Sequence, residues 1–375
     1  MSRGICLIAD SLDRRRGGAE SHLADLANAF VEAGHPVRAF LRRPGNTPSP
    51  IKIEQVANYL GWTALGEWEF ARAVQSRLAE TSEIVFSTPA MVIPAVTHYF
   101  SPGGLYRSGF EPERASFDPG LRRQFYWLGN RLNFQRQQRL AAQEKLLTRN
   151  PPLKVLTLSA AAREQILNHF HLPVDHVSTI PPGVDLAQFY PDPSRSPGTE
   201  KLRLLFVGHN ARLKGLHCLL RALRAARKSG LQAELTVVGG AHHEFQTLAS
   251  RLGLTGQVHF VGSLAGNEMS AQYQASDALI HPTFADHCSL VALEALASGL
   301  PVVTTRRNGA AELMESGRHG LIIDDPLDID HLADALLRLS DRDTLAAMRE
   351  AAIALRPQLD FANHARLVLE WLTGD

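Results

Sequence analysis

Two carboxylates, Asp286 and Glu294, have a spacing and surroundings that favour ligand binding. Residues 290–297 predict a helix that is apolar nearly all round, with Glu294 as its one charge. A carboxylate in such a helix costs free energy to bury unless a partner hydrogen-bonds it, and paired hydroxyls of a ligand would do so. A partly exposed glutamate, or one paired with an arginine from elsewhere in the chain, is the alternative interpretation. The helix by itself favours neither.

The start of this helix suits an anion. The apolar run 278–280 predicts a buried parallel strand that ends at a loop carrying Asp286. The backbone amides that follow lie at a helix N-terminus, where unpaired N–H groups and the helix dipole attract negative charge. These amides belong to His287, Cys288, Ser289 and Leu290. They predict a pocket for a phosphate and for the sugars on either side of it, and the Cys288 side chain is interpreted as a small packing residue.

Three polar residues follow another predicted strand, 202–208. His209, Arg212 and Lys214 precede a helix that runs to about residue 229, so two cations lie at the mouth of a parallel sheet beside a helix start. This arrangement suits a diphosphate, and solvent-exposed charge is the alternative. A diphosphate held by His209 alone would be bound in a pH-dependent way, because histidine titrates near neutrality.

The elements that must position these residues alternate between strand and helix. Residues 4–9, 20–33 and 37–41 predict a βαβ start, and five later strands separated by helices predict a doubly wound parallel sheet. The loop before the first helix holds Gly17 and Gly18, and glycines at a helix N-terminus let backbone amides approach an anion. A flexible solvated loop is the alternative there, since a Gly-Gly pair is a weak signal.

Asp286, the seven residues after it and Glu294, followed by Ala295 and the run 298–303, resemble the E-x7-E motif of the retaining glycosyltransferases of family 4. Asp286 stands where that family usually has glutamate. The resemblance implies the GT-B fold, an α/β fold of two Rossmann-like doubly wound parallel-sheet domains that face each other across a cleft. It also implies that Glu294 holds the ribose hydroxyls of a nucleotide-sugar. Asp286 and its neighbouring amides would contact the transferred sugar and the phosphate.

The resemblance includes the second group of polar residues. Lys214 falls on the family pattern G-R-x4-K-G, with His209 in the place of the arginine. Arg212, three residues on, would supply the missing charge. The resemblance therefore implies that Lys214 and Arg212 stabilise the departing diphosphate, with the helix amides sharing that charge.

Three further positions gain a role from the resemblance. The Gly17-Gly18 loop would approach the donor phosphates or the acceptor, and the turn at Gly262 would meet the base of the nucleotide. His98 is the acceptor-site candidate, although a lone histidine near a strand end is more often a hydrogen-bonded structural residue.

The IPPGVD stretch at 180–185 resembles the interdomain loop of the family. It predicts a first, acceptor-side domain over 1–182, to which a C-terminal helix within 356–375 returns, and a second, donor-binding domain over 183–355. Within the family, this stretch, the basic segment 101–150 and the His-Pro before the site loop are similar to the lipopolysaccharide core α-1,3-glucosyltransferase group.

The expected reaction is retaining transfer of a hexose, glucose by this resemblance, from a nucleotide diphosphate sugar such as a UDP-sugar. The acceptor would be a glycan or a lipid-linked glycan such as the lipopolysaccharide core. Front-face displacement is expected because no paired carboxylates stand at nucleophile spacing, and no cofactor and no metal are expected because no His/Asp ligand cluster appears. The alternatives are a GT-B epimerase or phosphorylase, and a sugar-nucleotide-binding protein without catalysis.

The segment 101–150 has an unusual composition. It holds nine basic and four acidic residues, a net charge of +5, with five Phe, Tyr or Trp residues between 117 and 134. Basic residues mixed with aromatics suit an anionic lipid surface or an anionic acceptor. The alternative is an amphipathic helix over 121–147 that packs on its own domain. Nucleic acid is a poorer interpretation, because no recognised binding motif accompanies the charge.

The overall composition is that of an ordinary globular chain. Its 375 residues are 45% hydrophobic and carry a formal charge of +1, so nothing in the net charge favours nucleic acid. Three scattered cysteines fit a reducing compartment. No apolar run approaches the length of a membrane-spanning helix and no signal-peptide pattern is seen, so the expected location is the cytoplasm, with peripheral contact at the inner face of the cytoplasmic membrane.

Overall fold

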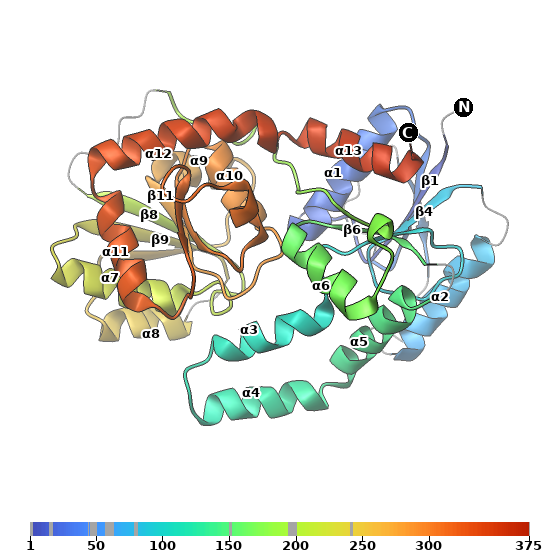
Figure 1. The fold of residues 1–375 in the computed structure, drawn as a ribbon, viewed down its shortest axis with the longest axis horizontal. Helices are drawn as coiled ribbons and strands as arrows, with labels where there is room; N and C mark the ends of the chain where they lie inside the picture. The colour runs from blue at the N-terminus through green and yellow to red at the C-terminus, as the bar shows by residue number, and fades with distance from the viewer. Residues whose placement is uncertain are drawn as a thin grey trace. The chain divides into compact units, whose positions relative to one another are not determined.

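The computed structural model describes residues 3–14, 18–43, 45, 51–56, 64–78, 82–149, 152–193, 201–240 and 243–374. The chain forms two compact units, each with a parallel β-sheet flanked by helices (Figure 1). Unit 1 comprises Met1–Phe110, Gly120–Pro181 and His364–Asp375, and unit 2 comprises Glu111–Pro119 and Pro182–Asn363. The predicted fold class of two Rossmann-like parallel-sheet domains is confirmed.

Unit 1 is built on a seven-stranded parallel sheet in the order β3-β2-β1-β4-β5-β6-β7. Its strands are β1 (Ile5–Ala9), β2 (Val37–Leu41), β3 (Lys52–Gln55), β4 (Ile84–Ser87), β5 (His98–Phe100), β6 (Lys154–Thr157) and β7 (Val177–Thr179). The helices of this part of the chain are α1 (Gly18–Glu32), α2 (Ala64–Arg77), α4 (Leu121–Leu132), α5 (Phe134–Leu147), α6 (Ala160–Phe170) and most of α13 (Phe361–Thr373), with the short helices η1 (Tyr106–Gly109) and η2 (Val174–His176). All five side chains of β1 are buried, as expected for a central strand covered on both faces.

Unit 2 has a six-stranded sheet in the order β10-β9-β8-β11-β12-β13. Its strands are β8 (Leu202–Val207), β9 (Ala233–Val238), β10 (Val258–Gly262), β11 (Ala278–His281), β12 (Val302–Thr305) and β13 (Gly320–Ile323). Its helices are most of α3 (Phe110–Ala115), α7 (Leu216–Lys228), α8 (His243–Arg251), α9 (Asn267–Ala275), α10 (Leu290–Ala297), α11 (Ile329–Leu339) and α12 (Arg342–Leu355), with η3 (Gly309–Leu313) and η4 (Arg356–Leu359). The last strand, β13, was not among the predicted ones.

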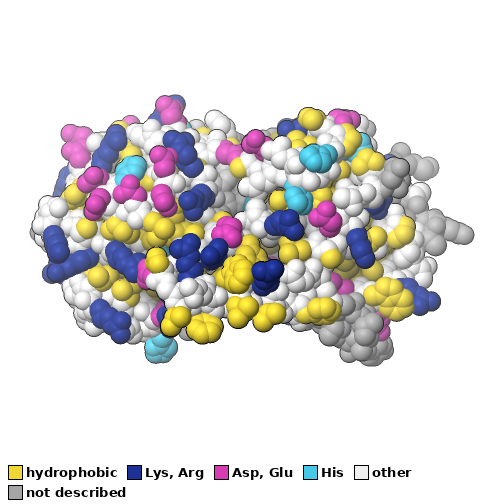
Figure 2. All heavy atoms as spheres, turned by 60° about the horizontal axis from the view of Figure 1, so that its bottom comes forward, with side chains coloured by type: hydrophobic (Ala, Val, Ile, Leu, Met, Phe, Trp, Pro, Cys, Tyr) yellow, Lys and Arg dark blue, Asp and Glu magenta, His cyan; other side chains and the backbone are white. Residues whose placement is uncertain are grey.

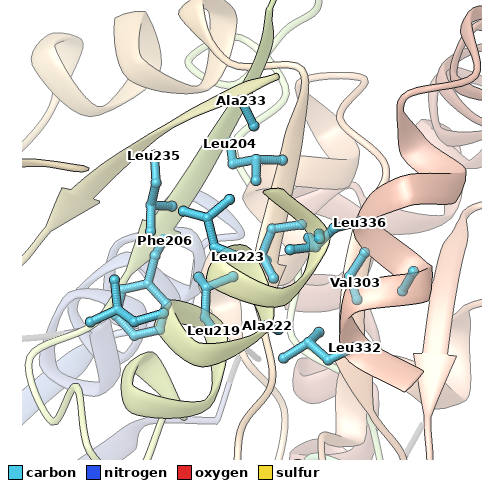
Figure 3. Close-up of a cluster of buried hydrophobic side chains, with 14 of the residues drawn as sticks. Leu204, Phe206, Leu219, Ala222, Leu223, Ala233, Leu235, Val303, Leu332 and Leu336 are labelled. Atoms are coloured by element: carbon cyan, nitrogen blue, oxygen red, sulfur yellow. The ribbon is translucent and has the colours of Figure 1, made fainter. Parts of the chain in front are cut away.

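The core of unit 2 lies between its sheet and the helices α7 and α11. Leu204 and Phe206 of β8 and Leu235 of β9 lie in one cluster with leucines of both helices (Figure 3). Full burial of each such side chain contributes roughly 1.5–3 kcal/mol, so this cluster fixes β8 and the start of α7 in place.

In each sheet the strand order reverses beside the first strand of the unit, between β1 and β4 in unit 1 and between β8 and β11 in unit 2. Ligands of open parallel sheets bind outside the carboxyl ends of the strands at this switch point. The loops after β1 and β4, and after β8 and β11, are therefore the places where chemistry is expected.

The unit boundaries differ from the predicted ones near the C-terminus. Residues 356–363 lie with unit 2, because Arg356 donates to the carbonyls of Leu186, Phe189 and Ala297, and Val184 pairs with Asp360 in a parallel bridge. The rest of α13 lies with unit 1, where the Trp371 ring meets the rings of His98 and Phe86.

The helix predicted over 121–147 is two helices. Asn133 interrupts it with an extended conformation, φ −73° and ψ 99°, and its side chain accepts the backbone N–H of Arg136 as the N-cap of α5. In the part of the chain that the structure describes, no helix is both long enough and apolar enough to cross a membrane.

Candidate active site

At the carboxyl edge of the unit 2 sheet, the loops after β8 and β11 are bound to each other. The backbone N–H of Phe284 donates to the Leu213 carbonyl at 2.8 Å, and the Thr283 hydroxyl donates to the same oxygen at 3.2 Å. Gly215 has φ +82°, and a Cβ atom there would lie 2.0 Å from the Pro282 carbonyl oxygen. A residue with a side chain cannot occupy this position without moving one loop.

Gly215→Ala is expected to lower the free energy of unfolding by more than about 3 kcal/mol, because strain at positive φ adds to a backbone clash. Gly230→Ala is the matched control: its φ is +100° but nothing lies within 4 Å of the added Cβ, so only the strain of about 1–2 kcal/mol should appear. Urea unfolding of both variants measures the difference. Equal losses of unfolding free energy in the two variants would mean that the loops after β8 and β11 move apart at little cost.

Lys214 and Asp286 meet between these two loops. The Lys214 Nζ lies 2.5 Å from Asp286 Oδ2, and both side chains are largely buried. The backbone of Asp286 is held by the loop after β12, since its N–H donates to the Arg307 carbonyl and its carbonyl accepts from Gly309 N–H. Burial opposes ionisation of Asp286, but the Lys214 ammonium overcomes this and lowers the pKa of the carboxyl. Two residues that the sequence predicted separately for the site are thus brought together as an ion pair.

Two histidines lie beside this ion pair. Burial, followed by the positive charge of Lys214, lowers the pKa of His281 to about 3. Burial also lowers the pKa of His287. Both imidazoles are therefore neutral at pH 7, and Lys214 supplies positive charge to this edge of the sheet.

The four amides predicted to bind an anion do not all point to a ligand. The Ser289 N–H donates to Asn308 Oδ1 at 3.1 Å, so this amide is already used inside the protein and its predicted role is corrected. Asn308 is fully buried, and its Nδ2 donates to the Thr304 hydroxyl at 3.0 Å. Leu290 begins α10, where a helix leaves its first N–H groups without helical partners.

The remaining two members of this set, His287 and Cys288, lie in the loop before α10. The Cys288 side chain is buried, and burial raises the pKa of its thiol well above the ordinary value. The thiol is therefore protonated, as a packing residue would be.

Glu294 has a partner that the sequence did not indicate. The Tyr273 hydroxyl, from α9, donates to Glu294 Oε2 at 2.7 Å. Burial raises the pKa of Glu294 to about 7, well above the ordinary value of a carboxyl. The side chain of Glu294 is partly exposed, as one of the two alternatives expected, and its hydrogen-bond partner is a tyrosine and not an arginine. Tyr273 lies five residues before β11 in a short helix, and nothing in its spacing from Glu294 links the two residues.

Arg212 makes several contacts within unit 2. Its guanidinium lies over the rings of Phe117 and Phe245, at 4.8 and 5.6 Å, and donates to the Ser116 carbonyl. It also pairs with Glu244 at 3.0 Å. These contacts hold Arg212 against α8 and residues 111–119, and its role on the diphosphate stays a prediction. Sequence patterns could not show that this segment packs on unit 2.

The other predicted donor-side residues lie at strand or helix ends. His209 is exposed directly after β8, and Gly262 ends β10 with φ +77°. Gly18 is the first residue of α1 and is exposed. Gly17 lies outside the described residues.

His98 is the first residue of β5 and is paired in register with Phe86 of β4 and Lys154 of β6. Its Nδ1 is 2.9 Å from the Thr97 hydroxyl, and its ring is 4.9 Å from the Trp371 ring. Burial lowers its pKa to about 4. These contacts are those of a packed, hydrogen-bonded residue, and the acceptor-site role of His98 stays a prediction.

A cavity of about 200 Å³ lies at the switch point of unit 1, between the loops after β1 and β4. The Arg42 side chain is 2% exposed there and pairs with Asp10 at 3.4 Å and with Glu67 at 3.9 Å. Leu23, Met91 and Phe100 supply apolar lining. Carboxylates fixed by a guanidinium beside apolar surface form a polar site that the sequence did not indicate.

The residues that the structure describes contain no cluster of three or more His, Cys, Asp or Glu side chains that could hold a metal ion.

Two family models match consecutive parts of the chain. Residues 16–188 match the model of Glycosyltransferase Family 4, and residues 191–354 match the model of glycosyl transferases group 1. Between them the two matches span nearly the whole chain.

Curated proteins give matches over part of the chain. A D-inositol 3-phosphate glycosyltransferase of Corynebacterium kroppenstedtii is 31% identical over 236 residues, which are 57% of this chain and 51% of the relative. A glycogen synthase of Mycobacterium tuberculosis is 30% identical over 209 residues, 55% of this chain and 50% of the relative. The chain spans about half the length of these relatives.

Solved structures match over the full length. WaaG, a glycosyltransferase involved in lipopolysaccharide biosynthesis, has a TM-score of 0.81 and 23% identity over 99% of this chain and 100% of its own. HepE of Anabaena, solved in complex with UDP and glucose, has a TM-score of 0.75 and 20% identity over 99% of both chains. At these identities the likeness shows a shared fold, the GT-B fold.

Proposed function

The chain belongs to the glycosyltransferases that join a family 4 domain to a group 1 domain, and we propose that it transfers a hexose from a nucleotide diphosphate sugar to a hydroxyl of a glycan or lipid-linked acceptor. The observation that carries this proposal is the Lys214–Asp286 ion pair next to α10, the helix that also holds Glu294. The loop after β8 thus offers a cation for a diphosphate, and the loop after β11 with α10 offers two carboxylates for hydroxyl groups.

The donor is bound by unit 2. Glu294 accepts the ribose hydroxyls, Lys214 binds the diphosphate and Asp286 contacts the transferred sugar. The UDP and glucose bound to HepE support a UDP-hexose, with glucose as the first sugar to test. The curated relatives add inositol phosphate and glucan acceptors to the classes that deserve a test.

The reaction proceeds with retention by front-face displacement. The acceptor oxygen bonds to the anomeric carbon on the face from which the diphosphate departs, the bond from that carbon to the phosphate oxygen breaks, and the acceptor proton passes to the departing phosphate. Asp286 is tied to Lys214 and is a poor nucleophile in that state. Lys214 stabilises the negative charge that develops on the leaving diphosphate, and no metal or other cofactor takes part.

The acceptor is bound by unit 1, in the cavity at its switch point. Asp10 and Glu67 are held by the buried Arg42, so their carboxylates are oriented before a ligand arrives. Carboxylates accept hydrogen bonds from vicinal hydroxyls, and Phe100 and Leu23 offer apolar surface to a sugar ring. This chemistry suits a sugar as the group that receives the hexose.

The experiment is a transfer assay with radiolabelled UDP-glucose and a panel of glycan and lipid-linked acceptors, after a binding screen of UDP-, ADP- and GDP-sugars. Appearance of label in the acceptor, with an α-anomeric product seen by NMR, supports the proposal. Release of free sugar without transfer, epimerised nucleotide-sugar, or binding without turnover would each identify one of the alternative functions instead.

We also propose that α4 brings the protein to an anionic membrane surface, where a lipid-linked acceptor lies. Leu121, Phe125, Leu128 and Leu132 form one helical stripe and are 46–73% exposed. Arg122 and Arg131 are exposed on the same helix. Figure 2 brings forward the side of the molecule that is at the bottom of Figure 1, where α4 lies, and hydrophobic and basic side chains are mixed on it. A helix of this composition inserts its apolar face at the headgroup level while arginines meet lipid phosphates.

Binding to vesicles is therefore expected to rise with anionic lipid and fall with salt, because each basic residue near such a surface contributes about 1 kcal/mol before screening. The test is co-sedimentation of wild type and an Arg122, Arg123, Arg131→Gln variant with neutral and anionic vesicles. A control variant changes three exposed arginines elsewhere, Arg77, Arg251 and Arg318, to Gln. Equal loss of binding in both variants would leave net charge, and not α4, as the cause.

A further inference from the structure

We propose that Tyr273 is a positioning residue for recognition of the nucleotide ribose: its hydroxyl holds the Glu294 carboxylate in the orientation that accepts the ribose diol. This inference rests on the proposed function, in which Glu294 binds that diol. It concerns a side chain that the E-x7-E motif does not include, because Tyr273 lies on α9 and precedes the motif.

The hydrogen bond has the geometry of a specific contact. The Tyr273 hydroxyl lies 2.7 Å from Glu294 Oε2 and 3.3 Å from the Val291 carbonyl, so the single proton goes to the nearer, more negative oxygen. Among the described residues, Tyr273 is the donor that reaches this carboxylate. Its bond occupies one side of Oε2 and leaves Oε1 for a ligand hydroxyl.

The tyrosine ring is itself fixed. Tyr273 is fully buried, and the Phe189 ring meets it edge to face at 5.7 Å. On either side of Tyr273 in α9, the Ser270 hydroxyl donates to the Gln188 carbonyl at 2.6 Å and the Gln274 amide donates to the Tyr190 carbonyl at 3.2 Å. These contacts bind α9 to residues 188–190. A hydroxyl on an immobilised ring can orient a carboxylate, whereas one on a mobile ring could not.

The same bond acts on ionisation of Glu294. Burial raises the pKa of this carboxyl to about 7, and the Tyr273 hydrogen bond opposes that rise because it stabilises the carboxylate. Burial raises the pKa of Tyr273 well above its ordinary value, so the tyrosine remains a donor throughout the neutral range. A ribose diol donates to the carboxylate and gains less from the protonated acid.

Other charged groups near α10 have their own partners or no charge. β11 contributes His281, which is neutral at pH 7, and η4 contributes Arg356, whose guanidinium donates to the Ala297 carbonyl. From α12, Arg349 donates to the Asp192 carbonyl. η3 contributes Glu312, whose negative charge adds to burial and to Asp286 in raising the pKa of Cys288. Burial and Tyr273 are therefore the influences that set the ionisation of Glu294.

The experiment measures the dissociation constants of UDP-glucose and 2′-deoxy-UDP-glucose between pH 6 and 9, for wild type and Tyr273→Phe. Both ligands lack a phosphate that titrates near neutrality, and the ratio of their constants isolates the ribose contact. In wild type we expect the preference for the ribonucleotide to weaken below about pH 7. In Tyr273→Phe we expect the midpoint of that change to move to higher pH, and the preference to stay about tenfold lower even at pH 9, since a hydrogen bond to a charged group contributes this much.

Tyr99→Phe is the matched control, because Tyr99 is also fully buried, loses a hydroxyl that accepts from Gln143, and lies in unit 1. It should leave both the ratio and its midpoint unchanged. A Tyr273→Phe ratio and midpoint equal to wild type would overturn the inference. If Tyr273→Phe does not fold, the wild-type measurement is the test. A ratio of the two dissociation constants that does not vary from pH 6 to 9 would contradict the inference. Failure of wild type to bind any nucleotide-sugar would instead overturn the proposed function.

Discussion

Lys214→Ala is expected to lower kcat for sugar transfer by about a hundredfold or more, while the affinity for the donor changes less. The Lys214 ammonium lies at the carboxyl edge of the unit 2 sheet, ahead of α7, where a diphosphate would be bound. Negative charge on the diphosphate grows as the bond to the sugar breaks, so a fixed cation stabilises the transition state more than the ground state. Steady-state kinetics and donor dissociation constants, measured on the same preparations, separate the two effects.

The ion pair makes a second explanation possible, and a double variant distinguishes it. Removal of Lys214 leaves the Asp286 carboxylate buried without its cation, and this charge would repel a diphosphate. If neutralising Asp286 were the sole task of Lys214, Lys214→Ala combined with Asp286→Asn would recover most of the lost rate. We expect little recovery. Lys228→Ala, at an exposed position near the end of α7, is the control for loss of a lysine. A kcat for Lys214→Ala within threefold of wild type would show that Lys214 does not take part in catalysis.

The sequence was sufficient for the fold because buried parallel strands are nearly continuous apolar runs. β1, β8 and β11 are such runs, and each was predicted within a residue or two. β3, at the edge of the unit 1 sheet, is largely exposed and reads KIEQ, so it has no apolar run to find. The interruption at Asn133 was missed because the residues on both sides of it continue the same helical pattern. A single asparagine within that pattern does not by itself indicate an N-cap.

For the site, sequence spacing located groups that one loop or helix carries and missed groups that tertiary structure brings together. Asp286 and Glu294 belong to one loop and helix, so their spacing contained their relation. Tyr273 and Asn308 reach the same helix from α9 and from the loop after β12, over 21 and 19 residues of chain. Arg212 shows the converse, since its position beside Lys214 in the sequence did not determine where its side chain points.

Glu294→Ala is expected to weaken donor binding by roughly 2 to 4 kcal/mol, which is about thirtyfold to a thousandfold in dissociation constant, because two hydrogen bonds from the ribose lose a charged acceptor. The loss should be large for UDP-glucose and small for its 2′,3′-dideoxy counterpart, and calorimetric titration of both ligands measures it. An unchanged preference between the two ligands would show that Glu294 does not contact the ribose.

The same substitution should have an effect of the opposite kind on the free protein. The pKa of Glu294 is about 7 in the folded state against an ordinary value of 4.5, so the folded state binds the proton more tightly than the unfolded state does. The stability that this group contributes is therefore fully present below pH 4.5 and is lost as pH rises through 7. The free energy of unfolding of wild type relative to Glu294→Ala should accordingly fall between pH 4.5 and 8, measured by urea unfolding without ligand. A difference in unfolding free energy that is constant over this range would mean that the Glu294 carboxyl is as well solvated in the folded protein as in the unfolded chain. Burial would then give no reason to expect that this carboxylate gains from a ligand with paired hydroxyls.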